Sequence, residues 1–207
     1  MSKILYYLLH GGACNGRVNN VVDTWGRNEN VVFYSDYEDV DRNIYKVSDG
    51  TDYWDLEEKH VKGIKFLKNN FQNYDWYFLC DDDTFVNTKK MNEFIQTCDE
   101  DTIYGFLINT WPNDPSLYYP SGGGGTLIHN KILHQLIDKI EMKGTRFADV
   151  TLGLNLLHEN FKVSNCEYFH SEHPNHYGIS YENVKDHITF HHIPSFDEMK
   201  KLNDLCN

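Results

Sequence analysis

Residues 76–87 read Trp-Tyr-Phe-Leu-Cys-Asp-Asp-Asp-Thr-Phe-Val-Asn, a short apolar run that ends in three consecutive carboxylates. Residues 76–80 have the length and aromatic content of a buried β-strand. Asn87 is typical of an N-cap, and apolar residues at helical spacing follow it up to residue 95. The three acids are therefore expected in a strand-to-helix loop.

Strand alternation predicts that Asp81 and Asp83 lie on one side of the chain and Asp82 on the other. The outer pair would then be able to share one hard divalent cation. Three adjacent negative charges repel one another, so their place beside a buried strand favours a site where a cation or hydrogen-bond donors offset that cost. The alternative interpretation is a solvated acidic turn.

The rest of the chain alternates between strand and helix patterns. The expected elements are strands at 4–9, 31–34 and 76–80, a short helix at 18–25, and an amphipathic helix at 56–71 with Lys, Glu and His on its polar face. This alternation favours a parallel sheet with ligands outside the carboxyl ends of the strands. Beyond residue 100 we expect a strand at 104–107, an aromatic and proline-rich loop at 111–120, and a helix at 131–140.

The composition indicates one globular domain spanning residues 1–207, because no linker or repeat divides the chain. A hydrophobic content of 40% with 14% aromatic residues is enough for a sizeable core. The net charge of −12 argues against nucleic acid as a partner. The same charge would repel a diphosphate, and a metal at the acidic cluster would reverse that local sign.

Five cysteines without CxxC or zinc spacing indicate reduced thiols rather than a disulfide framework. The apolar run at residues 4–9 is too short for a membrane span. Without a signal peptide or an anchor in this chain, the expected location is the cytoplasm. The sequence does not indicate an oligomeric state.

Several further segments occur in an order that is similar to one known family. They are Arg-Val-Asn-Asn-Val-Val-Asp-Thr-Trp at 17–25, Val-Phe-Tyr-Ser-Asp at 32–36, Ser-Gly-Gly-Gly-Gly at 121–125, Asp-Val-Thr-Leu-Gly at 149–153, Phe-His-Ser at 169–171 and Phe-His-His at 190–192. With the acidic cluster, this series resembles the fringe and core-1 β-1,3-glycosyltransferase family over nearly the whole chain.

The resemblance implies the GT-A nucleotide-diphosphosugar transferase fold, an α/β architecture with a Rossmann-like mixed sheet flanked by helices. Residues 1–100 would form the nucleotide-binding half and residues 101–207 the acceptor-binding half. The implied reaction is metal-dependent transfer from a UDP-sugar to a hydroxyl of a glycan or glycoprotein acceptor.

The resemblance also implies a metal site. Asp83 and His191 would bind the ion directly, and Asp81 directly or through water. His191 and His192 are expected on opposite faces of a strand, so only one of them would be a ligand, and Thr189-Phe190-His191 matches the family pattern. Carboxylates with one imidazole favour Mn²⁺, with Mg²⁺ as the alternative.

The donor site is implied in the same way. Asp82 would hold the ribose or sugar of the donor, and Arg17 and Asp36 would contact uridine or diphosphate. Gly123 and Gly124 would contact the donor sugar, whereas composition alone is equally consistent with a flexible turn. Aromatic residues of the 109–119 loop and its neighbours, namely Trp111, Tyr118 and Tyr119, would stack on sugar or pack in the core.

Asp149 lies near the expected start of a helix, where a carboxylate often serves as a simple cap. In the family the corresponding acid is the general base that takes the proton of the acceptor hydroxyl. A base in that position implies an inverting reaction. Ala148 departs from the family, because many relatives carry a second acid there.

Secretory members of the family carry an N-terminal anchor, and the anchor-less arrangement also resembles glycosyltransferase domains encoded by chlorella viruses. Two other functions remain open. A metal-dependent phosphohydrolase or nuclease would also use clustered carboxylates, although two-metal sites draw acids from several strands. An inactive sugar-binding module would lack the metal cluster or the base. The transferred sugar and its acceptor depend on loops that no motif decodes.

Overall fold

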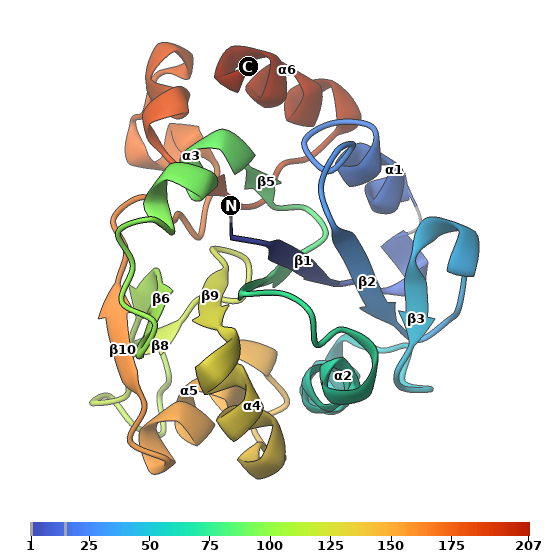
Figure 1. Cartoon of the computed structure of the whole chain (residues 1–207), viewed down its shortest axis with the longest axis vertical. Coiled ribbons are helices and arrows are strands. Elements are labelled where there is room, and N and C mark those ends of the chain that lie inside the picture. The colour runs from blue at the N-terminus through green and yellow to red at the C-terminus, as the bar shows by residue number, and fades with distance from the viewer. Residues whose placement is uncertain (1, 15) are drawn as a thin grey trace.

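The computed structural model describes residues 2–14 and 16–207. A seven-stranded sheet runs through the centre of the chain (Figure 1), in the order β10-β6-β9-β4-β1-β2-β3. Its strands are β1 (Ile4–Leu9), β2 (Val31–Ser35), β3 (Ile44–Lys46), β4 (Trp76–Asp81), β6 (Thr102–Gly105), β9 (Thr126–His129) and β10 (Lys162–Asn165). The pairs are parallel except that β9 runs antiparallel to both β4 and β6. The predicted Rossmann-like mixed sheet is confirmed.

Helices cover both faces of the sheet (Figure 1). One face carries α1 (Gly16–Val22), α3 (Thr88–Phe94) and α6 (Phe196–Cys206), and the other carries α2 (Leu56–Asn70), α4 (Asn130–Lys139) and α5 (Ala148–His158). Short 3₁₀ helices lie in the connections, at η1 (Gly12–Cys14), η2 (Val40–Arg42), η3 (Tyr53–Asp55), η4 (Pro174–Tyr177) and η5 (Tyr181–Asp186). The result is three layers, helix, sheet and helix.

Strand β1 shows why the apolar runs are continuous rather than alternating. Tyr6 and Leu8 enter the core under α1, α3 and α6, while Leu5 and Tyr7 enter the core above α2, α4 and α5. A parallel strand that is covered on both faces needs apolar residues at every position. The same double burial holds for residues 76–80 of β4, which deliver the acids to the edge of the sheet.

Two short antiparallel ribbons supplement the sheet. β5 (Phe85–Val86) pairs with β11 (Thr189–Phe190), and β7 (Leu107–Ile108) pairs with β8 (Tyr119–Pro120). The predicted strand at 104–107 is therefore divided between two sheets, and the predicted loop at 111–120 ends in a strand. The β5–β11 ribbon brings the segment after Phe190 against the loop that follows β4.

The other predicted elements lie within a few residues of the observed ones. Asn87 caps α3 as expected, because its side-chain oxygen accepts a hydrogen bond from the backbone N–H of Lys90 at 3.1 Å. All five cysteines are free thiols. Within residues 2–14 and 16–207, no helix combines the length and the apolar character needed to cross a bilayer.

The polar face predicted for the 56–71 helix is wrong at three positions. Glu57, Lys59 and His60 are buried, although helical spacing and their charge suggested exposure. Each has found a polar partner inside the fold, which is the condition for burying such groups. The Lys59 ammonium lies 3.6 Å from a carboxylate oxygen of Asp36, and a ring nitrogen of His60 lies 2.8 Å from the Tyr34 hydroxyl.

Glu57 of α2 binds the segment that precedes α5. Its carboxylate accepts hydrogen bonds from the backbone N–H groups of Lys143, Gly144 and Arg146, at 2.5, 2.9 and 3.1 Å, and from the Thr151 hydroxyl at 2.8 Å. Burial acts to raise the pKa of Glu57, but these donors outweigh it and leave the pKa below its usual value. The start of α5 is thereby fixed to α2.

We predict that Glu57→Gln lowers the free energy of unfolding at pH 7 by about 2 to 3 kcal/mol, because several donors lose a charged acceptor. The lowered pKa means that this stability is complete above the usual value of 4.5 and is lost as the pH falls below it. Urea denaturation at pH 7 and at about pH 3 should therefore show the gap between wild type and variant closing in acid. Glu58→Gln, at the more exposed neighbouring acid of α2, is the matched control. An equal loss in both variants would contradict the role of Glu57.

Candidate active site

The polar side chains of the site gather where three parallel strands end. Leu9, the last residue of β1, pairs with Tyr34 of β2 on one side and with Asp81 of β4 on the other. His10 and Asp36 follow directly after β1 and β2. The carboxyl edge of a parallel sheet is where ligands bind in such folds.

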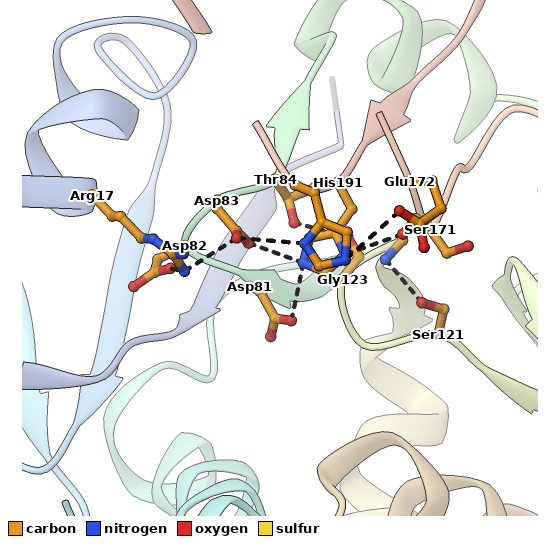
Figure 2. A network of polar contacts seen from close by, with 12 residues as sticks. Arg17, Asp81, Asp82, Asp83, Thr84, Ser121, Gly123, Ser171, Glu172 and His191 are labelled. Atoms are coloured by element: carbon orange, nitrogen blue, oxygen red, sulfur yellow. Dashed lines mark hydrogen bonds and ion pairs between the residues drawn. The ribbon is translucent and has the colours of Figure 1, made fainter. Parts of the chain in front are cut away.

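Strand alternation does not run through the acids, because β4 ends at Asp81 and the next two acids lie in a turn. Asp82 lies on the Arg17 side of the cluster (Figure 2). It is 3% exposed, with one oxygen 2.5 Å from His10 Nδ1 and the other 3.0 Å from Arg17 Nη1. The same Arg17 nitrogen lies 3.1 Å from Asp83. Protein groups thus contact both Asp82 oxygens. Sequence reasoning missed His10, although its position directly after a strand end was a usable signal.

His191 faces the other two acids (Figure 2). Its Nδ1 lies 3.2 Å from the Ser171 carbonyl oxygen, which can only accept, so Nδ1 carries a proton. Its Nε2 lies 2.9 Å from Asp83 Oδ1 and 3.5 Å from Asp81 Oδ2. In the neutral ring this Nε2 has a lone pair directed at carboxylate oxygens, a repulsive arrangement unless a proton or a metal ion lies between them.

The electrostatics and the donor atoms fit a divalent cation. Among residues 2–14 and 16–207, buried Asp83 Oδ1 has no partner with hydrogen-bond geometry. Burial acts to raise the pKa of Asp83, but His191 and Arg17 outweigh it and lower that pKa. Burial acts to lower the pKa of His191, but Asp83 and Asp81 outweigh it and raise that pKa. A metal ion bound by these carboxylates would replace the imidazolium proton.

His192 does not take the opposite face of a strand, as the sequence suggested. β11 ends at Phe190, and His192 adopts a left-handed φ of 56°. Its ring instead stacks on that of His191, with centroids 3.7 Å apart, and its Nδ1 lies 3.9 Å from Asp83 Oδ2. Ligand atoms of Asp83, His191 and His192 all lie within 4.8 Å of one another. Both histidines can therefore face one ion.

The glycine run packs directly beneath His191. A Cβ added at Gly123 would lie 2.1 Å from atoms of the His191 ring, so only glycine leaves room for this imidazole. The carbonyl groups of Gly123 and Gly124 accept hydrogen bonds from the hydroxyls of Thr84 and Thr189, at 2.8 and 2.7 Å. Both glycines therefore help to shape the backbone around His191. Their predicted contact with the donor sugar stays a prediction.

Asp149 lies in the first turn of α5, across from the acidic cluster. Its Oδ1 accepts a hydrogen bond from the backbone N–H of Val150 at 2.8 Å. A small cavity is lined by Asp149, Asp81 and Gly122, so the run contributes Gly122 here. Burial raises the pKa of Asp149, and backbone donors offset part of that rise. A carboxylate with a raised pKa in a cleft is suited to accept a proton.

The remaining candidates lie further from these acids or point elsewhere. Asp36 accepts hydrogen bonds from the Gly12 N–H at 2.8 Å and the Ser35 hydroxyl at 2.9 Å, beside buried Lys59. Tyr119 is 3% exposed in a small apolar cluster that Trp111 also joins. Core packing therefore accounts for Tyr119, whereas Tyr118 is 61% exposed.

The chain matches one family model and is similar in fold to several solved structures. A family model described as Fringe-like matches residues 14–205. A glycosyltransferase involved in the glycosylation of the major capsid of the chlorella virus PBCV-1 is 16% identical, with a TM-score of 0.59, over 98% of this chain and 99% of that one. No curated protein matches the sequence.

Two bacterial structures are also similar. The glycosyltransferase GlyE of Streptococcus pneumoniae is 14% identical, with a TM-score of 0.53, over 96% of this chain and 56% of that one. A 4-diphosphocytidyl-2C-methyl-D-erythritol synthase of Anaerococcus prevotii is 12% identical, with a TM-score of 0.52, over 80% of this chain and 86% of that one. These likenesses confirm the GT-A type of fold that the sequence predicted.

We predict that Asp83→Ala abolishes Mn²⁺ binding, because Asp83 faces both imidazoles. His191→Ala should weaken Mn²⁺ affinity by about 100-fold and His192→Ala by less than about 10-fold, since His192 is more exposed and more distant. Isothermal titration with Mn²⁺ measures these constants, with His134→Ala on the exposed surface of α4 as the control. A larger loss in the His192 variant would transfer the main role to that residue.

Proposed function

The chain belongs to the Fringe-like family, and from this premise we propose that it is a metal-dependent glycosyltransferase that moves a sugar from a UDP-sugar to a hydroxyl group of a glycan or glycoprotein. The observation that carries the proposal is the arrangement of His191, Asp81 and Asp83. An imidazole nitrogen meets two carboxylates at the carboxyl edge of the sheet, and a further acid with a raised pKa, Asp149, lies across the same cleft.

The acids and the imidazole would hold one divalent cation, Mn²⁺ in preference to Mg²⁺. Asp83 and His191 are the proposed direct ligands, with Asp81 binding directly or through water, and His192 is an additional candidate. When bound, the ion supplies positive charge that offsets the negative charge of the diphosphate.

The chain's own cation beside this site is Arg17, whose side chain is 44% exposed while it contacts Asp82 and Asp83. An exposed guanidinium can bind a phosphate group through two parallel N–H···O hydrogen bonds. We therefore assign Arg17 to the diphosphate, and Asp36 stays a proposed contact of uridine or diphosphate. Asp82, with both oxygens contacted by protein, would act on the donor by holding Arg17 in place.

Asp149 is the proposed general base. Its carboxylate would accept the proton of the acceptor hydroxyl while that oxygen attacks the anomeric carbon and the bond to the diphosphate breaks. A single displacement from the side opposite the leaving group inverts the anomeric configuration. Burial of the carboxyl favours this role, because it raises the pKa of Asp149.

The two other functions receive less support. A two-metal phosphohydrolase needs ligands for a second ion, and among residues 2–14 and 16–207 the one cluster of three ligands within bonding range of a common ion is Asp83, His191 and His192. An inactive sugar-binding module would have no use for a buried carboxylate beside that cluster. Metal-dependent release of UDP from a panel of UDP-sugars, with and without acceptors, separates these possibilities.

We predict that Mn²⁺ strengthens the binding of UDP by about 10-fold or more, because a diphosphate that approaches three carboxylates is otherwise repelled. Calorimetric titration of UDP with Mn²⁺ and with EDTA measures the difference. Uridine, which has no phosphate, is the control ligand and should bind equally in both buffers. Equal UDP affinity in the two buffers would count against a metal-assisted donor site.

We predict that Asp149→Asn lowers kcat for sugar transfer by about 100-fold or more while UDP-sugar affinity is kept. Asparagine retains the side-chain oxygen that accepts from Val150 but cannot take a proton. Asp138→Asn on the surface of α4 is the matched control. Transfer by the Asp149 variant at the wild-type rate, or an NMR spectrum of the product that shows the donor's configuration retained, would remove Asp149 from the role of base.

A further inference from the structure

The cavity behind the acidic cluster contains a polar group that the proposed reaction does not use. Besides Asp81 and Asp149, its walls include Tyr34 and His60, so it reaches from the active site toward α2. Its volume is about 20 Å³, and most of its lining is apolar, with Tyr34, His60, Asp81 and Asp149 among the polar residues of its wall. A space of this size holds one water molecule where several polar groups can reach it.

His60 presents an unsatisfied nitrogen there. The residue is 6% exposed, and its Nδ1 lies 2.8 Å from the Tyr34 hydroxyl. Its Nε2 is buried and has no hydrogen-bond partner within the part of the chain that the structure describes. Burial lowers the pKa of His60 to about 4, so the ring is neutral near pH 7. One of its nitrogens therefore carries a proton and the other a lone pair.

The Tyr34 hydroxyl determines which nitrogen carries the proton. This hydroxyl is buried and must donate its proton, and within residues 2–14 and 16–207 the acceptor in reach is His60 Nδ1. Nδ1 thus holds the lone pair, and Nε2 carries an N–H. A buried N–H without an acceptor is costly, and His60 lines the same small cavity as the carboxyl-bearing residues Asp81 and Asp149.

We propose that one water molecule occupies this cavity, accepts a hydrogen bond from His60 Nε2 and donates to Asp81 and Asp149, which makes His60 a positioning residue for the acids. Such a water makes three hydrogen bonds, the usual number for a buried water. It satisfies the orphaned N–H and gives each carboxyl a donor on its inner side. The inference rests on the proposed function only for its catalytic consequence.

The consequence concerns the orientation of Asp149. One of its oxygens is held by the N–H of Val150, and the bridging water would hold the inner side of the same carboxyl. With both contacts the carboxyl plane is fixed before the acceptor arrives, as groups behind a catalytic or metal-binding side chain commonly achieve. His60 never contacts the substrate, so its removal should change kcat rather than donor affinity.

The kinetic test compares His60→Leu with His60→Gln. The leucine variant should lose about 10- to 100-fold in kcat with the KM for UDP-sugar within about twofold of wild type, and glutamine, whose side-chain amide offers an N–H, should recover most of that loss. Val61→Ala on the same helix, a buried apolar site, controls for a general loss of stability. Wild-type kcat in the leucine variant, or equal loss in both His60 variants, would overturn the positioning role.

The structural test does not depend on activity. Nitrogen-15 NMR of the histidine rings should show His60 as the Nε2–H tautomer at pH 7, and Tyr34→Phe should abolish that preference because the fixing hydroxyl is gone. A crystal structure should show one water bound to His60 Nε2. The Nδ1–H tautomer in the wild-type protein, or a dry cavity, would overturn the water bridge. Confirmation of both features in a protein that transfers no sugar would instead contradict the proposed function.

Discussion

The mutual repulsion of the carboxylates at 81–83 is the constraint on which the rest of this edge of the molecule depends. Each acid is buried or half-buried at the end of a strand that is covered on both faces, so water cannot screen the charges well. The fold brings Arg17, His10 and His191 to these acids from three separate parts of the chain. His10 contacts Asp82, and Arg17 contacts both Asp82 and Asp83. His191 contacts Asp81 and Asp83.

The backbone around the acids has to be shaped for these partners. A glycine at 123 leaves the space in which the His191 ring lies, and two threonine hydroxyls donate to the carbonyls of Gly123 and Gly124. The ribbon between β5 and β11 sets the register, so that the segment after Phe190 returns to the loop after β4, where the N–H of Ile193 donates to the Asp83 carbonyl at 3.0 Å. The position of His191 beside Asp83 is thus maintained by backbone contacts as much as by the two side chains.

Local pattern in the sequence was sufficient for β1, β2 and β4 and for the acidic edge, because an apolar strand that ends in acids has few alternatives. It did not predict the sheet strands β3, β9 and β10. It failed where tertiary partners override local preference. The sequence predicted Lys59 and His60 on an exposed polar helix face. Both are buried instead, because Lys59 pairs with Asp36 and His60 contacts the Tyr34 hydroxyl. His192 read as the next strand residue, but its left-handed φ turns it onto His191. Neither effect leaves a trace in residue spacing, since each depends on atoms that are distant in the sequence.

The pairing of β5 with β11 also determines when the site can assemble during protein synthesis. The ribosome completes the sheet strands β1, β2 and β4, together with the three acids, about a hundred residues before it adds the imidazole at 191. Until that late segment docks, the acids lack one of their counter-charges, and the contact that brings it is long-range and therefore slow to form. Until then the nascent chain would carry the three acids without His191, and the proposed metal site would form only when the C-terminal segment docks.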